Sequence, residues 1–455
     1  MKPITATLLT CASLASPSDW PYWLGADRSL VGDGSPPTEW GEEKNVAWKV
    51  PVPGHGLSSP VVVGDTIYLT TAVVTEAGVA AAKTWAEEEA KRAEEETDTG
   101  RPRMAMTPPT EHELRVLALD LATGETRWSR TAATLTPHEG THADASFATP
   151  TIAVDGGRVH ASFGSLGIFT YDADGELLWS HDLGDMSVSG AFGEGTSPVL
   201  ASGNLVILWN HEGDSFLVAF DAETGDEAWR RPRERGTLWS SPGVARVGER
   251  ELVVVVGPST VAYDAATGEV AWSIGGDGSP TEEPREIPRG EGGPIATPIV
   301  SGGMLFTSMG GRRGMLVGVD VASEAADEGL ESERIAWKHT GDTPGITTPL
   351  VLDGVLYVMK RGGGMLGAFD AASGEAHYTA ERLDAVARTY ASLVAAGGHV
   401  YITGRDGVFE LVRAGEAFES VAVNRLDDRF DATPAIVGDR LLLRGHDHLY
   451  CIARR

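Results

Sequence analysis

Hydrophobic and polar residues alternate along most of this chain, in short runs that end at a polar turn. Leu114, Val116 and Ala118, for example, lead into Asp120 at a two-residue spacing. A two-residue period is that of a β-strand with one buried face, whereas a helix repeats every three or four positions. The pattern therefore predicts an all-β protein made of many short antiparallel strands.

One turn between such strands recurs in nearly the same nine residues. Asp opens the turn by accepting hydrogen bonds from its own backbone, and the Gly of a Thr-Gly or Ser-Gly pair takes the positive φ. An aromatic residue then closes the unit, which predicts a strand end, a tight turn and a second strand. The copies are DLATGETRW at 120–128, DAETGDEAW at 221–229, DAATGEVAW at 264–272 and DAASGEAHY at 370–378.

A second landmark precedes each group of strands: Ser or Thr, then Pro, then a β-rich run. The copies lie about 42–56 residues apart, which is the period of a four-stranded propeller blade, and an insertion lengthens the first interval. An eighth copy has Ser392 followed by Leu393 in place of Pro. The other seven are Ser59-Pro60, Thr149-Pro150, Ser197-Pro198, Ser241-Pro242, Thr297-Pro298, Thr348-Pro349 and Thr433-Pro434.

The closing aromatics show how the repeats form a ring. The last unit ends the chain before it reaches an aromatic, while residues 45–50, which contain Trp48, precede the first start. Because an open sheet edge invites aggregation, we predict that Trp48 completes the last blade of an eight-bladed β-propeller over residues 45–455. Seven blades are the alternative, which leaves one start or one aromatic unexplained. The other aromatics are Trp128, Trp179, Trp229, Trp272, Trp337, Tyr378 and Phe418.

One stretch departs from the β pattern. Residues 76–99 are rich in Ala, Glu and Lys, and they predict a helix inserted in the first blade, within an insertion of about 76–109 that returns as a Pro-rich loop. We expect a solvated decoration in preference to a partner-binding element. The apolar positions expected to dock on the ring are Val79, Ala82, Trp85 and Ala86.

The first residues resemble a secretory leader. Residues 1–15 have one Lys, an apolar stretch too short to span a bilayer, and small residues near Ala15, so we expect a signal peptide and a periplasmic or secreted protein. Thr10 is a poor residue before Cys11, so we do not expect a lipid anchor. Residues 16–44 are an N-terminal extension. Without the leader, Cys451 is the one remaining cysteine, which excludes a disulfide framework.

The net charge of the chain limits the classes of partner that it can bind. The net charge of −28 disfavours nucleic acid and anionic membrane surfaces. We expect a monomer without a transmembrane segment.

Candidate chemistry gathers in one class of loops. In a four-stranded blade, the loop between strands two and three and the loop into the next blade share one face, and these loops are the irregular, charged ones. We predict a polar binding face around that mouth of the central channel. Its candidates are His138, Glu139, His142, Glu194, His211, Glu212, Asp214, Arg312, Arg313, Lys360, Arg361, Arg405, Asp406, Asp431 and His446.

These candidates permit several readings. His138 to His142 match H-E-x-x-H, but Pro137, Gly140 and a following strand argue against the helix that a zinc protease needs. A mixed His and carboxylate site for zinc or manganese is possible in principle, although mutual hydrogen bonding is favoured. The Arg and Lys residues form either a basic sector for a carboxylate or phosphate, or, as we favour, partners that neutralise Asp406, Asp428 and Asp431.

The repeat SP…L-x-AxD-xx-TG-E-xx-W resembles the PQQ-like repeat over roughly residues 45–452. Two branches of that family differ in function: quinoprotein dehydrogenases, which hold pyrroloquinoline quinone and calcium on the axis, and BamB-type scaffolds without a cofactor. WPYWLG at 20–25, NVAWKVPVPGHGLSSP at 45–60 and PHEGTHAD at 137–144 are similar to exported PQQ-like proteins of planctomycete-type bacteria. No vicinal Cys pair or catalytic motif of the dehydrogenases matches a position here.

The resemblance favours a non-enzymatic, exported scaffold that binds a ligand or a protein or peptide partner of the cell envelope through the loop-rich face. No cofactor is expected on this reading. The alternative is a quinoprotein-type oxidoreductase that binds pyrroloquinoline quinone with calcium in the axial pocket.

Overall fold

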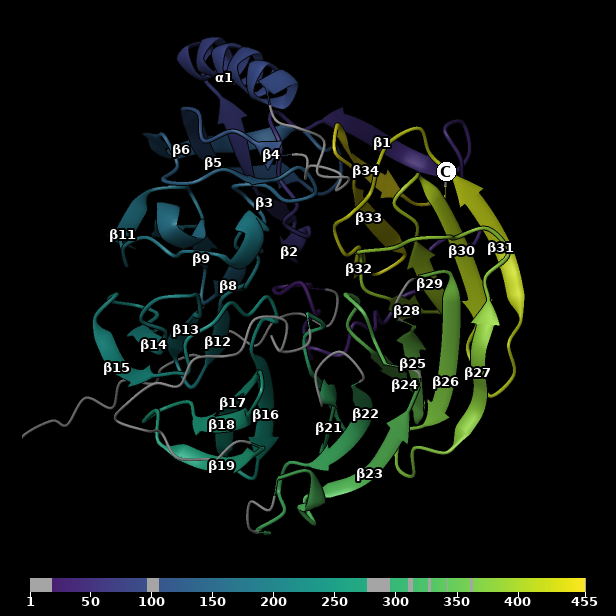
Figure 1. Cartoon of the computed structure of the whole chain (residues 1–455). Helices are drawn as coiled ribbons and strands as arrows, with labels where there is room; N and C mark the ends of the chain where they lie inside the picture. Colours follow the sequence, from purple (N-terminus) through teal and green to yellow (C-terminus); the bar gives the residue numbers. More distant parts are fainter. Residues whose placement is uncertain are drawn as a thin grey trace, which may run out of the picture.

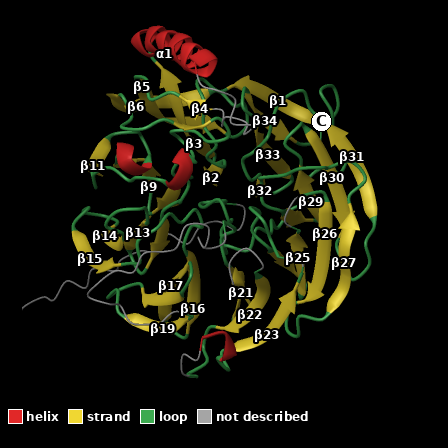
Figure 2. Ribbon diagram, in the orientation of Figure 1, coloured by secondary structure: helices red, strands yellow, loops and turns green. Residues whose placement is uncertain are grey.

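The protein is a ring of eight sheets. The computed structural model describes residues 19–95, 106–275, 295–309, 314–325, 329–341, 343–360 and 363–454. Each of the eight sheets has four antiparallel strands, and the sheets follow one another around a central axis (Figure 1). Strands dominate, and one long helix projects from the ring (Figure 2). The predicted eight-bladed propeller is confirmed.

Each blade runs from the strand nearest the axis to the strand at the outside. Blade 1 is formed by β2 (Val61–Val63), β3 (Thr66–Val74), β5 (His112–Asp120) and β6 (Thr126–Leu135). Blade 2 is formed by β8 (Ala153–Asp155), β9 (Arg158–Ser162), β10 (Ile168–Asp172) and β11 (Leu177–His181). Blade 3 is formed by β12 (Val199–Ala201), β13 (Asn204–Trp209), β14 (Phe216–Asp221) and β15 (Glu227–Pro232). Blade 4 is formed by β16 (Gly243–Val247), β17 (Arg250–Val256), β18 (Thr260–Asp264) and β19 (Val270–Ile274).

The second half of the ring repeats this order. Blade 5 is formed by β20 (Ile299–Ser301), β21 (Met304–Met309), β22 (Met315–Asp320) and β23 (Ile335–Thr340). Blade 6 is formed by β24 (Leu350–Leu352), β25 (Val355–Met359), β26 (Met365–Asp370) and β27 (Ala376–Arg382). Blade 7 is formed by β28 (Val394–Ala396), β29 (His399–Thr403), β30 (Val408–Arg413) and β31 (Ser420–Arg425). Short 3-10 turns lie at Gly164–Leu166, Ser189–Ala191 and Gly329–Glu331.

Blade 8 joins the two ends of the propeller. It contains β32 (Ala435–Val437), β33 (Arg440–Arg444) and β34 (His448–Ile452), and its outer strand is β1 (Val46–Pro51). Trp48 of β1 pairs with Cys451, and Val50 pairs with Leu449. Figure 1 shows the purple strand β1 beside the yellow strand β34. The predicted closure by Trp48 is therefore confirmed, and the seven-bladed alternative is wrong.

The repeated turn serves as a seat for the aromatic of the preceding blade. The turn glycines Gly175, Gly225 and Gly268 have φ between +71° and +82°, and their backbones lie against Trp128, Trp179 and Trp229. A Cβ on any of them would stand 2.6–2.9 Å from the indole. The indole nitrogens of Trp128 and Trp229 also donate to the carbonyls of Ala173 and Ala265, at 2.9 and 3.0 Å. The motif recurs because each copy docks two neighbouring blades.

Two repeats depart from the predicted register. In blade 7 the position of the closing aromatic is taken by Ala422, which pairs with Leu411, while Phe418 precedes β31 and packs on Tyr378. Phe418 is therefore not the equivalent of the tryptophans. In blade 2 the residue two positions before the inner strand is Thr151, so Thr149-Pro150 is two residues out of register with the other starts.

The predicted helical insertion is confirmed for its described part, while residues 96–105 lie outside the described residues. α1 (Glu76–Glu95) lies between β3 and β5 and projects from the edge of blade 1 (Figures 1 and 2). Ala82 and Trp85 are partly buried, but Val79 is 60% exposed and Ala86 is exposed, so the expected docking of these last two is wrong. The insertion returns through β4 (Met106–Thr107), which pairs with β7 (Thr141–His142) in the loop to blade 2. No helix in the described residues is long and apolar enough to span a bilayer.

The N-terminal extension covers inner strand edges that would otherwise be unpaired. Trp20 exchanges backbone hydrogen bonds with Val62 of β2, at 2.7 and 2.8 Å. Two blades away around the ring, residues 30–32 pair with Ala395 of β28. Trp20 and Leu30 are almost fully buried by this arrangement. Between these two contacts, Arg28 donates to the carbonyl of Leu200 in blade 3, across the ring from blade 7, so the extension crosses the channel and becomes part of the core.

The seat for the tryptophan allows a matched test. Gly203 and Gly225 lie in blade 3 and have the same φ of +78°, but only Gly225 contacts a tryptophan, whereas a Cβ on Gly203 would meet nothing within 4 Å. We expect Gly225→Ala to lower the free energy of unfolding by about 1–3 kcal/mol more than Gly203→Ala, because the added methyl is forced into Trp179. Chemical denaturation of both variants measures this difference. Equal losses would contradict the docking role of the turn.

Candidate functional site

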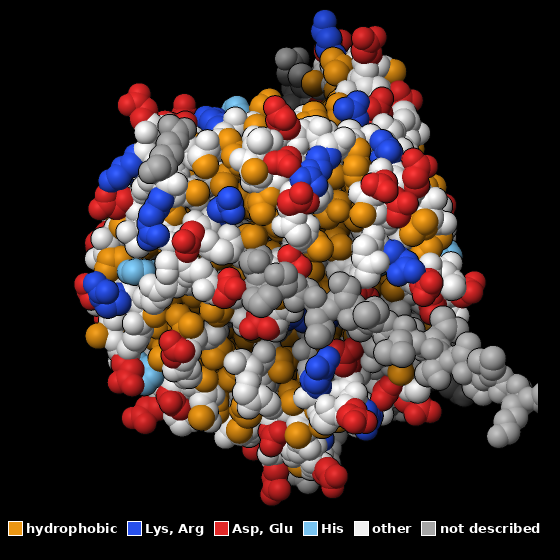
Figure 3. Space-filling view, turned by 180° about the vertical axis from the view of Figure 1, so that it is seen from behind, with side chains coloured by type: hydrophobic (Ala, Val, Ile, Leu, Met, Phe, Trp, Pro, Cys, Tyr) orange, Lys and Arg blue, Asp and Glu red, His pale blue; other side chains and the backbone are white. Residues whose placement is uncertain are grey.

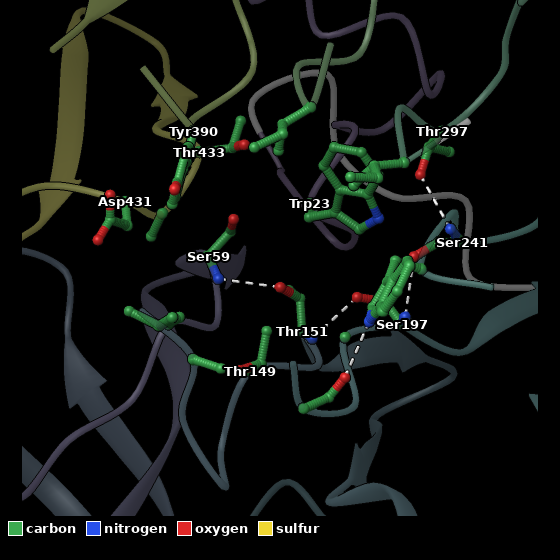
Figure 4. Close-up of a pocket in the computed structure, with 18 of the residues that line it drawn as sticks. Trp23, Ser59, Thr149, Thr151, Ser197, Ser241, Thr297, Tyr390, Asp431 and Thr433 are labelled. Atoms are coloured by element: carbon green, nitrogen blue, oxygen red, sulfur yellow. Dashed lines mark hydrogen bonds between the residues drawn. The ribbon is translucent and has the colours of Figure 1, made fainter. Parts of the chain in front are cut away.

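The channel is a well that opens on the loop-rich face. Its cavity of about 430 Å³ lies within the range of small-ligand pockets. Its lining comes from all eight blades and from the N-terminal extension, whose Trp23 projects into the cavity (Figure 4). Because the extension crosses the channel below Trp23, the well has a floor and a single described mouth. The exposed surface inside is mainly apolar.

A belt of hydroxyl side chains encircles the well, and we call it the hydroxyl belt. One residue of each blade, two positions before the inner strand, contributes to it, and every one of the eight is Ser or Thr. Each is buried as a residue but reaches the cavity surface. The members are Ser59, Thr151, Ser197, Ser241, Thr297, Thr348, Ser392 and Thr433.

The belt also joins the blades. At six of the eight junctions, the backbone N–H of one member donates to the hydroxyl oxygen of the next, at 2.9–3.1 Å. Figure 4 shows four of these bonds in succession, from Ser59 to Thr297. Within the described part of the chain, no belt hydroxyl donates a hydrogen bond of its own. The hydroxyl hydrogens therefore remain available to the cavity.

The mouth of the well is largely apolar on one side. Phe192, Ile295 and Ile346 line it and are 48%, 40% and 37% exposed. Trp239 also lines the cavity and packs edge-on against Phe192, and its indole nitrogen donates to the carbonyl of Gly193 at 3.0 Å. Exposed apolar side chains that surround a cavity are typical of a binding site.

The other side of the mouth is a cluster of ion pairs that we call the seam cluster. Arg405 of blade 7 donates to Asp431 at 2.5 Å and to Asp144 at 2.9 Å. Arg429 donates to the same two carboxylates, at 3.1 and 2.6 Å. His446 of blade 8 lies 3.0 Å from Asp431. The cluster ties the loops of blades 7 and 8 to the loop that leaves blade 1.

A second charge lies buried beneath the seam cluster. Arg444 of β33 is 2% exposed and donates to the carbonyls of Ser58 and Thr70 in blade 1, at 2.8 and 2.7 Å, and to the Ser58 hydroxyl. Burial lowers its pKa to about 9, which leaves the guanidinium charged at neutral pH. Burial, with the charges of His446 and Arg444, lowers the pKa of His55 to about 4. Blade 8 is thus joined to blade 1 by buried polar contacts as well as by β1.

Glu194 stands in the wall between the well and a smaller hollow beside His138. Its carboxylate accepts two hydrogen bonds from Ser165, one from the backbone N–H and one from the hydroxyl, both 2.6 Å. Burial raises the pKa of Glu194 to about 7. The carboxyl group therefore changes charge near neutral pH.

The remaining predicted candidates near blades 2 and 3 bond to loop backbone. His138 lies 2.7 Å from the carbonyl of Met186, and Glu139 accepts from the N–H of Val188. His211 accepts from Ser187 N–H at 3.0 Å, and burial lowers its pKa. Among the described residues, no three His, Cys, Asp or Glu side chains converge as metal ligands do. His142 lies in the strand β7, so the H-E-x-x-H motif is not helical.

The other candidates fall into four groups. Glu212 accepts from Thr237, and Asp214 pairs with Arg235 at 2.6 Å, away from the well. His142, Glu194 and Asp431 line the well. Lys360 is bridged to Pro344 through the backbone, and Asp406 lies beside Gly404. Arg312, Arg313 and Arg361 lie outside the described residues.

Sequence reasoning missed several residues of the site. Trp23 lies in an extension with no repeat signal, and Asp144, Tyr390 and Arg429 lie in loops of irregular length. Six of the eight belt residues are the Ser or Thr of the Ser/Thr-Pro landmark, which by itself indicates only where a blade begins. Asp428 is not neutralised by Arg405: its carboxylate accepts backbone N–H groups of Arg429, His446 and His448 at 2.7–3.1 Å.

Comparison with known proteins gives one family and one fold. A family profile described as outer membrane protein assembly factor BamB matches residues 23–173, 164–328 and 290–455. BamB from Moraxella catarrhalis is similar in structure, with a TM-score of 0.53 and 15% identity over 78% of this chain and 94% of that one. Quinohemoprotein alcohol dehydrogenase from Comamonas testosteroni has a TM-score of 0.61 and 12% identity over 97% of this chain and 82% of its own. No curated protein matches the chain in sequence.

The seam cluster predicts a large cost for removing one of its carboxylates. The Asp431 side chain is 2% exposed and pairs with two guanidinium groups. We expect Asp431→Asn to lower the free energy of unfolding by about 3–5 kcal/mol, since it leaves Asp144 as the one carboxylate of the cluster that balances the two guanidinium groups, of which Arg405 is largely buried. Denaturant titration measures the loss. Glu419→Gln, which breaks a fully exposed pair with Arg413, is the control and should leave stability nearly unchanged; similar effects of both variants would contradict this role.

Proposed function

Because the chain belongs to the family of the outer membrane protein assembly factor BamB, we propose that it is an exported, non-enzymatic scaffold that binds a protein partner of the cell envelope. The partner binds the loop-rich face. BamB is by its name an assembly factor, and a scaffold of this kind needs a surface for binding rather than a reaction centre. Charge further limits the partner, because a net charge of −28 disfavours nucleic acid. Figure 3 shows acidic side chains spread over one face and interspersed with Lys and Arg.

One observation supports this proposal above the others: exposed apolar side chains gather at the mouth of the well. Three of the large exposed hydrophobic residues of the described chain, Phe192, Ile295 and Ile346, line this one cavity. They come from different blades, so a single partner surface would cover them together. Apolar side chains in the centre of a contact, with charged groups such as the seam cluster at its margin, are the usual arrangement of a protein interface.

The alternative is a quinoprotein-type oxidoreductase, which the fold likeness to quinohemoprotein alcohol dehydrogenases favours. The described lining does not suit that cofactor. Pyrroloquinoline quinone carries three carboxylates, whereas the described lining contains Asp144, Glu194 and Asp431 and neither Lys nor Arg. The described guanidinium groups that contact the lining carboxylates, Arg405 and Arg429, are already paired with Asp144 and Asp431. We therefore derive no reaction step through the quinone.

The exposed apolar residues at the mouth of the well allow a test of partner binding. We expect Ile346→Asp and Phe192→Asp to weaken binding of an envelope partner at least tenfold, because a charge is buried in the centre of the contact. Leu177→Asp is the matched control, since Leu177 is 54% exposed on the outer strand of blade 2. Site-specific crosslinking in native envelopes, followed by affinity measurement, compares the three. Equal retention by all variants would contradict binding through this face.

The quinone alternative has its own test. Purified protein incubated with pyrroloquinoline quinone and calcium should show no change in the absorption spectrum of the quinone and no dye-linked oxidation of alcohols. The reason is that no described cation faces the cavity to hold the cofactor carboxylates. Spectral change with turnover would replace the scaffold proposal by the oxidoreductase.

A further inference from the structure

We propose that the well is a binding site for an uncharged saccharide, separate from the protein contact at the mouth of the well. The inference begins from the hydroxyl belt. The hydrogen bond between blades does not explain why all eight positions carry a hydroxyl. Two of the eight junctions lack that bond, yet the residues that would accept it there, Ser59 and Thr348, are hydroxyl residues too. A complete ring of hydroxyls on the wall of a cavity therefore indicates a ligand as well as a joint.

Each belt hydroxyl retains hydrogen-bonding capacity toward the cavity. A Ser or Thr hydroxyl has one hydrogen to donate and two lone pairs with which to accept. At six junctions, one lone pair of the hydroxyl oxygen accepts a backbone N–H. Within the described residues, no belt hydroxyl donates its hydrogen to another group. Every member can therefore donate one bond and accept another. Sugar hydroxyls have the same capacity, so a sugar ring surrounded by the belt could satisfy both partners.

An aromatic side chain supplies the platform that a sugar ring needs. The indole of Trp23 stands within the ring of hydroxyls in Figure 4, and its nitrogen makes no hydrogen bond with the described chain. Trp239 and Tyr390 form parts of the wall. The face of an aromatic ring is electron-rich and attracts the polarised C–H bonds on one face of a pyranose, while the hydroxyls at the edge of the sugar point toward the belt.

Charge decides against ionic ligands. The described lining has no Lys or Arg for an anion. Its carboxylates are already engaged: Asp144 and Asp431 pair with Arg405 and Arg429, and Glu194 accepts from Ser165. A cation would therefore find no free carboxylate there. A neutral ligand does not have to leave water as an anion without a cationic partner or as a cation without an anionic partner.

Shape separates a saccharide from a peptide. The well is closed below by the extension, and its wall repeats the same group around one axis. An extended peptide is recognised along a strand edge or groove, with donors and acceptors in alternation. The inner edges of blades 1 and 7 are already paired with the extension, so a compact ring fits this wall better than a strand.

The experiment probes the full chain with an array of short neutral, acidic and amino oligosaccharides, together with short peptides. Hits are then titrated by calorimetry and by tryptophan fluorescence, to which Trp23 and Trp239 would respond. We expect saturable binding of at least one neutral oligosaccharide with a change in tryptophan emission. Binding to acidic or amino sugars alone, to peptides alone, or to no probe would overturn the proposal.

Matched variants locate the site. Ser197→Ala and Ser392→Ala each remove one belt hydroxyl and should weaken saccharide binding by about three- to tenfold. Ser215→Ala is the control, because Ser215 is also buried and its hydroxyl also accepts a backbone N–H, from His211 at 3.1 Å, but it does not line the well. Equal weakening by all three, or by none, would place the saccharide elsewhere. Ile346→Asp and Phe192→Asp test the protein contact at the mouth of the well, whereas Ser197→Ala and Ser392→Ala remove hydroxyls of the belt, so the two proposals can fail independently.

Discussion

Two repeated contacts join most neighbouring blades of this ring, and the remainder of the structure depends on them. At the outside, a tryptophan lies flat against the glycine of the following turn, as Trp229 does against Gly268. At the axis, a backbone N–H donates to a hydroxyl of the adjacent blade, as Ser197 does to Ser241 at 2.9 Å. A propeller has no continuous core, so the angle between blades is set by such repeated contacts. Because the inner contact is made by side chains that line the well, the scaffold and the candidate site share the same atoms.

The junction between blades 8 and 1 carries additional polar contacts. This is the position where the chain ends meet, and β1 closes the last sheet there by pairing with β34. Arg444 lies buried across the same junction and bonds to carbonyls of blade 1, and the seam cluster around Asp431 lies above it. Buried ion pairs add little net stability but are costly to break, so they favour one arrangement over its alternatives. These contacts disfavour an open ring in which β1 is released.

The N-terminal extension stabilises the ring and also contributes to the candidate site. Trp20 covers the inner strand of blade 1, Arg28 contacts blade 3, and Leu30 covers the inner strand of blade 7. Between them, the chain is held across the axis, which brings Trp23 into the well. The insertion of blade 1 acts in a comparable way, since its return strand β4 pairs with β7 and so fixes the loop that carries His142 and Asp144. Segments outside the repeat therefore shape both the floor and the mouth.

The sequence by itself determined the architecture. Strand period, turn chemistry and the Ser/Thr-Pro landmark are local signals, and their repetition allowed eight blades, the closure by Trp48 and the helix of blade 1 to be predicted. The site was decided by tertiary structure, because its members are distant in sequence: Asp144 and Arg405 are 261 residues apart, and nothing local to either indicates the other. The predicted positions were also wrong in two repeats: the belt residue of blade 2 is Thr151 and not Thr149, and Ala422 takes the place of the closing aromatic in blade 7. The repeat specifies how a blade is built, whereas which loops meet over the axis depends on ring closure and on the path of the extension.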